Sequence, residues 1–78
     1  MVGKKVHIHE SWYTTATGDA RAYELVYEGQ VDEVDNHMMK VVDCHLVRRP
    51  FQEVSKNEPK ETRWFNTAAS TFKSILEL

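Results

Sequence analysis

Cysteine is nearly absent from this sequence: Cys44 is the single one, so no internal disulfide can form. Small domains that work in oxidising compartments usually depend on several disulfides, so we expect a cytoplasmic protein. The first five residues lead into an alternating segment rather than an apolar stretch, which argues against a signal peptide. No apolar run reaches the length of a transmembrane helix, so we expect no membrane partner.

Glycine is also scarce, with three residues standing far apart at positions 3, 18 and 29. Glycine-rich phosphate loops and nucleophile elbows need closely spaced glycines, so these motifs are absent from the sequence. No cofactor-binding signature is found either. We therefore expect neither enzymatic activity nor a bound cofactor.

The sequence lacks a strong excess of charge of either sign. Ten Lys and Arg residues stand against twelve Asp and Glu residues, which gives a net charge of −2. This balance argues against a dedicated binder of nucleic-acid backbones, because such affinity comes from neutralising phosphates with cations. Four of the acids lie close together, and without them the net charge would be +2, so a basic face is still compatible with the sequence: Glu28, Asp32, Glu33 and Asp35.

Large apolar side chains are few as well. A chain of 78 residues is expected to form one domain, residues 1–78, and to bury only about 60% of its unfolded surface. The core must therefore come from a small set of bulky residues: Trp12, Tyr23, Leu25, Tyr27, Phe51, Trp64, Phe65 and Phe72.

Residues 4–15 show the alternation of a half-buried strand, although Glu10 and Tyr13 interrupt it. Gly18 and Asp19 suit the two central positions of a hairpin turn. The register that follows places Trp12 opposite Leu25. It predicts a core face formed by Val6, Ile8, Trp12, Tyr23, Leu25 and Tyr27.

The next segments predict a loop and a central strand. Residues 29–36 are polar and acidic, which is typical of a loop, and residues 38–49 are apolar on both alternating faces. Residues 51–54 and 62–65 flank a polar turn centred on Glu58. A hairpin there would place Glu53 opposite Arg63 and Phe51 opposite Phe65.

The last segment predicts a helix. After the polar pair Asn66 and Thr67, either of which can cap a first helical turn, apolar residues recur at three- and four-residue steps: Ala68, Phe72, Ile75 and Leu76. An alternative begins the helix near Asn57, with Pro59 in its first turn. The helix that follows Thr67 predicts an α+β fold, a mostly antiparallel four-stranded sheet in the order β-β-β-β-α with the C-terminal helix packed on one face.

Several groups of residues resemble metal-binding or catalytic sites, but their spacing does not support such sites. His7 and His9 project from the same side of a strand, as metal-binding imidazoles do, and Asp43 and His45 are expected on the same face. A simple meander places a strand between the two pairs, so we expect no metal site. Cys44 and His45 project to opposite faces and cannot act as nucleophile and base, and we expect Cys44 to be a buried apolar residue. The acidic segment does not follow the ligand order of a calcium loop.

The sequence therefore favours a non-catalytic binding module that docks on a protein partner as a small adaptor or inhibitor. Small domains without a cofactor motif are frequent among phage-type and mobile-element accessory proteins. The predicted interface is the uncovered sheet face together with the acidic segment: His7, His9, Tyr13, Glu24, Val26, His45, Asp32, Glu33 and Asp35.

The alternative is a sheet that binds nucleic acid, because cations and aromatic residues alternate along the predicted strands. Its candidate cations are Lys4, Lys5, Arg21, Arg48, Arg49 and Arg63. A histidine metal site is the third hypothesis. The sequence does not predict the oligomeric state.

Overall fold

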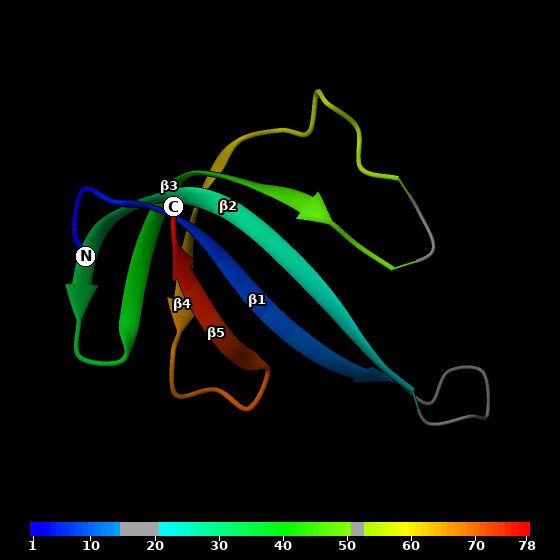
Figure 1. Ribbon diagram of the computed structural model, residues 1–78. Coiled ribbons are helices and arrows are strands. Elements are labelled where there is room, and N and C mark those ends of the chain that lie inside the picture. Colours follow the sequence, from blue (N-terminus) through cyan, green and yellow to red (C-terminus); the bar gives the residue numbers. More distant parts are fainter. Residues whose placement is uncertain (15–20, 51–52) are drawn as a thin grey trace.

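The computed structural model describes residues 1–14, 21–50 and 53–78. They form one antiparallel sheet in the order β4-β3-β2-β1-β5 (Figure 1). The strands are β1 (Lys5–Thr14), β2 (Arg21–Asp35), β3 (Met38–Arg48), β4 (Glu61–Asn66) and β5 (Phe72–Glu77). These residues contain no helix, so none is long and apolar enough to cross a membrane. The predicted α+β fold is wrong: the described part of the chain is all-β and has five strands.

A turn and a strand occupy the place of the predicted C-terminal helix. The Asn66 side chain accepts a hydrogen bond from the Ala68 amide at 3.0 Å, as a helix cap would, but only a short turn follows. β5 then pairs with β1, and Ile75 lies opposite Ile8. The pairing shifts near Phe72, which lies opposite Glu10, so one extra β5 residue is accommodated there. This bulge lets two inward-facing residues stand three positions apart, which is why the spacing resembled a helix.

The helix start proposed near Asn57 is also wrong, because residues 53–60 contain no helix and residues 61–66 form β4. The hairpin centred on Glu58 is wrong as well. β4 pairs with β3, which places Phe65 opposite Met39 and Arg63 opposite Val41. Phe51 lies outside the described residues.

The loop predicted for residues 29–36 is wrong, because β2 continues to Asp35 and only Asn36 lies beyond it. Asn36 and His37 form a two-residue turn into β3, and Asn36 has a φ of 59°. Asn tolerates this left-handed conformation better than most residues and is favoured in tight hairpin turns. The acidic residues therefore lie on a strand rather than in a loop.

The β1–β2 register differs from the predicted one by two residues, with Trp12 opposite Tyr23 and Ile8 opposite Tyr27. A shift of two residues keeps every side chain on its face, because the side-chain period of a strand is two. The predicted turn at Gly18 and Asp19 lies outside the described residues. The core face was thus assigned correctly for Val6 and Ile8, which are fully buried.

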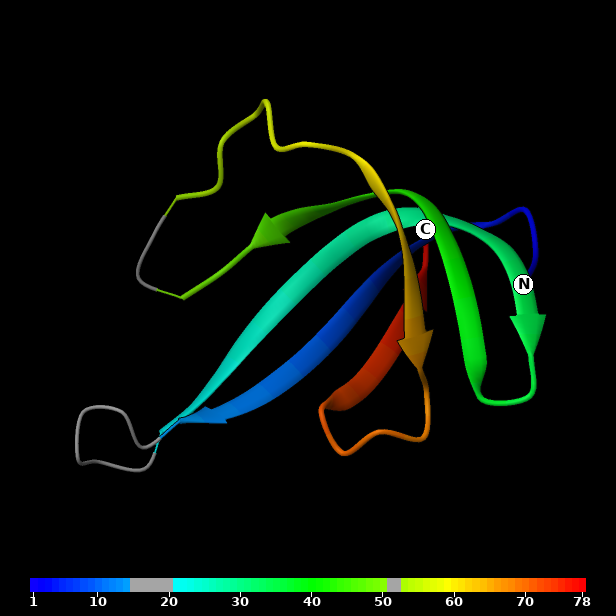
Figure 2. The same ribbon diagram turned by 180° about the vertical axis from the view of Figure 1, so that it is seen from behind.

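Trp12 is not a core residue, and the expectation that it is one was wrong. Its side chain is 39% exposed. The β5 ladder ends opposite Glu10 and the β3 ladder ends opposite Val26. In the described part of the chain, the ends of β1 and β2 nearest Trp12 are therefore paired only with each other. Figures 1 and 2 show this two-stranded ribbon extending away from the sheet.

The core lies on the inner face of the sheet, which β1, β2 and β3 form as an arch (Figure 2). Every strand contributes to one apolar cluster, so the sheet curls around its own core. The buried members are Val6, Ile8, Tyr27, Val31, Met39, Val41, Cys44 and Phe65, and the partly buried ones are Leu25, Leu46, Phe72 and Ile75. The opposite side of the sheet is called the outer face below.

The β2–β3 ladder contains a β-bulge at the middle of β2. Between the pairs Glu28–His45 and Gln30–Val42, one β2 residue, Gly29, lies opposite two residues of β3. Asp43 in the bulge has a φ of 51°. A Cβ atom on Gly29 would overlap the Val41 side chain, so the close approach of the strands requires glycine.

Candidate functional site on the outer face

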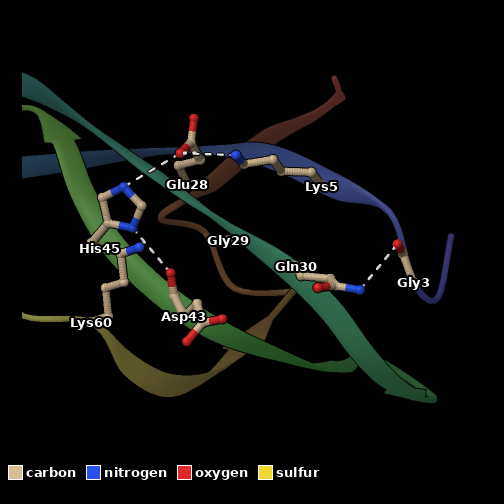
Figure 3. Close-up of a pocket in the computed structure, with 8 residues that line it drawn as sticks. All are labelled: Gly3, Lys5, Glu28, Gly29, Gln30, Asp43, His45 and Lys60. Atoms are coloured by element: carbon tan, nitrogen blue, oxygen red, sulfur yellow. Dashed lines mark hydrogen bonds and ion pairs between the residues drawn. The ribbon is translucent and has the colours of Figure 1, made fainter.

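The outer face is organised around the carboxylate of Glu28 in β2. Its Oε1 atom lies 3.0 Å from His7 Nε2, and its Oε2 atom lies 3.4 Å from His45 Nε2. The same Oε2 atom is 3.8 Å from Lys5 Nζ. Figure 3 shows Lys5 and His45 approaching Glu28 from opposite sides. Glu28 is the register partner of both histidines, so the strand pairing itself brings the three side chains together.

A second carboxylate on the same face, Glu24, forms a similar cluster toward the two-stranded ribbon. Its Oε1 atom is 3.1 Å from His9 Nδ1 and also accepts a hydrogen bond from the Arg48 guanidinium. Each cluster therefore joins β1, β2 and β3. Together they form a network in which positive and imidazole groups surround each of the two acids.

These contacts favour the charged form of both acids. The hydrogen bond from His7, helped by the positive charge of Lys5, lowers the pKa of Glu28 below its ordinary value of 4.5, although partial burial opposes this. The hydrogen bonds from His9 and Arg48 lower the pKa of Glu24. Both groups are therefore carboxylates at neutral pH.

The lowered pKa of Glu28 predicts a pH-dependent contribution to stability. A carboxyl group whose pKa is lower in the folded state stabilises the fold above its unfolded pKa, and this contribution is lost as the pH falls through the folded value. We expect Glu28→Gln to be less stable than the natural chain at neutral pH, and the difference to narrow below pH 4.5. Urea denaturation at several pH values measures this difference. A difference that stays constant down to pH about 3 would contradict the assignment.

An open pocket of about 320 Å³ lies beside Glu28 (Figure 3). Gly29 and Asp43 of the β2–β3 bulge are among the residues that line it. Its lining offers hydrogen-bond donors and acceptors in close alternation: Gly3, Lys5, Glu28, Gly29, Gln30, Asp43, His45 and Lys60. This arrangement suits a polar group that presents both donors and acceptors.

The three histidines of the metal hypothesis do lie on one face, but they do not converge on one point. β2 separates β1 from β3, as expected for a meander, so His7 and His45 approach Glu28 from different strands. His9 contacts Glu24 instead. Across residues 1–14, 21–50 and 53–78, no group of three or more His, Cys, Asp or Glu side chains has a geometry that could hold a metal ion.

Cys44 is fully buried on the inner face, as the sequence suggested, whereas His45 contacts Glu28 on the outer face. Burial raises the pKa of the Cys44 thiol to about 11. The thiolate, which is the reactive form, is therefore scarce at neutral pH. The two neighbouring residues do not form a nucleophile–base pair.

The other predicted interface residues are spread over the outer side of the molecule. Tyr13 is 69% exposed on the ribbon, whereas Val26 is only 3% exposed between His9 and Arg48 and offers almost no surface. Asp32 forms an ion pair with Lys40 at 3.5 Å, and Glu33 and Asp35 are exposed near the end of β2.

Five of the six cations of the nucleic-acid hypothesis have carboxylate or aromatic neighbours within the chain. Lys4 contacts Glu77 at 3.9 Å and Arg49 contacts Glu58 at 3.0 Å, while Lys5 and Arg48 belong to the clusters above. Arg63 is half-buried and lies over the rings of Tyr27, at 4.6 Å, and Phe65, at 5.4 Å. Arg21 begins β2.

The positions of two acidic residues, Glu28 and Glu10, were not predicted from the sequence. The position of Glu28 between His7 and His45 depends on the registers of two strand pairs. Glu10 is 7% exposed, and its Oε1 atom has no hydrogen-bond partner among the described residues. Its even position beside Val6 and Ile8 already pointed to the inner face, but its charge made it look like a break in the pattern.

Comparisons with models of protein families, with curated proteins and with solved structures gave no significant match to this chain. The case for a function therefore rests on the geometry of the chain's own residues. The outer-face clusters are the strongest candidate site, because the pairing of β1, β2 and β3 brings their side chains together.

Proposed function

We propose that this chain is a non-catalytic module that binds a protein partner through its outer face and acts as a small adaptor or inhibitor. The docking surface comprises the two carboxylate clusters and the exposed ribbon tyrosine: Lys5, His7, His9, Tyr13, Glu24, Glu28, His45 and Arg48. The acids near the end of β2, Asp32, Glu33 and Asp35, extend this surface toward the β2–β3 turn.

The observation that carries the proposal is the internal pairing of charges on the outer face. Glu28 lies among Lys5, His7 and His45, and Glu24 lies between His9 and Arg48. Such a surface presents alternating donors and acceptors with little net charge. A protein surface of complementary pattern can match it, and this kind of electrostatic complementarity provides specificity and orientation.

Exposed apolar side chains at the borders of these clusters support the same proposal. Tyr13 is 69% exposed, and Leu76, opposite His7 on β5, is 57% exposed. Aromatic residues are enriched at protein interfaces, where an apolar contact is surrounded by polar groups. Tyr13 and Leu76 are therefore the proposed apolar contacts of the docking surface.

The ion pairs between the outer-face cations and carboxylates make nucleic acid the less favoured partner. Phosphates attract cations that are free to neutralise them, and the affinity grows with the number of such contacts. Lys5 and Arg48 already neutralise carboxylates, and Arg63 lies half-buried over aromatic rings. A phosphate would have to compete with the chain's own acids for these groups.

A cytoplasmic location is part of the proposal. Cys44 is a free, buried thiol, and reduced thiols are the normal state of cysteine in the cytosol.

The proposal predicts which side chains a partner contacts. Affinity capture from the native cell, performed with and without nuclease, should recover a protein with the natural chain. Tyr13→Ser and Leu76→Ser should each reduce its recovery at least about tenfold, the loss expected when one well-buried interface side chain is removed. The matched control is Val34→Ser, because Val34 is 51% exposed but lies opposite the core residue Met39, on the inner rather than the outer face.

Two results would contradict this function. Recovery that depends on intact nucleic acid, together with salt-sensitive binding of short oligonucleotides, would favour the nucleic-acid alternative. Equal loss of recovery with Val34→Ser would show that the losses do not depend on the outer face.

A further inference from the structure

β5 lies at one end of the sheet, with β1 as its neighbour and no second strand paired to it in the described part of the chain. One side of β5 therefore carries backbone N–H and C=O groups without a strand partner. Such an edge is a template for another strand, and many proteins protect it with short strands, bulges or charges. β5 has a bulge and two charges of opposite sign, Lys73 and Glu77.

The hydrogen bonds to β1 determine which β5 residues face this edge. The Leu78 amide donates to the Lys5 carbonyl at 2.9 Å. Alternate residues of an antiparallel strand bond to the same neighbour, so Leu76 and Ser74 also face β1. The backbone groups of Ile75 and Glu77 consequently point away from the sheet.

The sequence of this edge is self-complementary. In an antiparallel pairing of two β5 strands centred on Ile75, each Ile75 lies opposite its symmetry mate and each Lys73 lies opposite Glu77 of the other copy. Centring the pair one residue later would place Ile75 opposite Glu77, and centring it one residue earlier would place Lys73 opposite Ile75. Only the Ile75-centred register pairs opposite charges at both ends.

The side chains at this edge are available for such a contact. Lys73, Ser74 and Glu77 are exposed, and the Glu77 carboxylate has a distant ion pair with Lys4 at 3.9 Å. Exposed pairs of this kind contribute little to stability, so Glu77 can exchange partners readily. Leu76 and Leu78 are 57% and 56% exposed, and the pairing would place Leu78 opposite Phe72 of the second copy.

We propose that two copies of this chain form a symmetric dimer by antiparallel pairing of their β5 edges, centred on Ile75, with Lys73 and Glu77 as reciprocal ion pairs. The two sheets then continue into one another across a two-fold axis. A symmetric pairing closes on itself after two copies, because each copy uses the same edge.

Charge reversal tests both the edge and its register. Sedimentation velocity of the purified chain over a range of concentrations should show monomer and dimer. Lys73→Glu and Glu77→Lys should each raise the dimer dissociation constant about tenfold at low salt, because each variant places like charges opposite one another twice. The double variant, Lys73→Glu with Glu77→Lys, restores both pairs and should dimerise like the natural chain.

Mixing the two single variants gives a sharper test. One carries acids at both positions and the other carries bases, so an equimolar mixture should form mixed dimers although neither variant dimerises well alone. Both positions are exposed, so circular dichroism spectra and melting temperatures should match those of the natural chain. The proposal would be overturned if the chain stayed monomeric or formed assemblies larger than two copies. It would also be overturned if the charge reversals left the dimer dissociation constant unchanged. These measurements use the chain alone and are independent of capture by a partner on the outer face.

Discussion

Replacing Ile8 by alanine is expected to lower the free energy of unfolding by about 2–5 kcal/mol, the range measured for isoleucine truncation in a packed core. Ile8 is fully buried and lies between Tyr27 on β2 and Ile75 on β5. The neighbouring strands hold their side chains in place, so the cavity can close only partly. For a small domain this loss is a large fraction of the total stability.

The matched comparison is Trp12→Ala, which removes a larger side chain from the same strand. Trp12 is 39% exposed on the ribbon, so we expect a loss of about 1 kcal/mol, typical of a partly exposed position. Urea denaturation followed by circular dichroism gives both values. If the Trp12 variant were the less stable of the two, the core would extend along the ribbon and the placement of Trp12 would be wrong.

The contrast between Ile8 and Trp12 shows what the alternation of β1 could predict. Alternation assigned Val6 and Ile8 to the core face correctly, because side chains of a strand alternate whatever its register. It did not predict where the neighbouring strands end. Trp12 is exposed because β3 and β5 do not accompany β1 that far, which depends on pairings distant in the sequence.

The helix error at the C-terminus has a local physical cause. Phe72 and Ile75 stand three residues apart, and both pack against the core. A regular strand would place them on opposite faces, so the spacing favoured a helix, and only a bulge in the β1–β5 ladder reconciles it with a strand. Bulges depend on the partner strand, and their positions are difficult to derive from one segment.

The outer-face site was predictable in part. The histidines on β1 and β3 were expected on the same side of the sheet, and the structure places His7, His9 and His45 there. The central position of Glu28 was not predicted, because residues 29–36 read as a loop and β2 was expected to end before them. Gly29 contributed to that error, since glycine weakens a strand assignment.

Gly29 supports a further prediction with a large effect, because the bulge that lines the pocket depends on it. A Cβ atom at this position would overlap the Val41 side chain and would lie 3.0 Å from the Val42 carbonyl oxygen and 3.2 Å from the Cys44 Cα. The first contact involves a core side chain, and the other two involve backbone atoms of β3. Gly29→Ala should therefore force β2 and β3 apart and lower the free energy of unfolding by about 1–3 kcal/mol, as overpacking does.

A double-mutant cycle with Val41→Ala separates these contacts. Removing the Val41 methyl groups makes room for the new Cβ, so the double variant should be more stable than the sum of the two single losses predicts, by about 0.5 kcal/mol or more. Relief should be incomplete, because the Val42 and Cys44 backbone atoms remain close. Denaturation midpoints of the four proteins measure the coupling. Additive losses would show that the Val41 side chain does not cause the loss, which would then come from the Val42 and Cys44 backbone atoms.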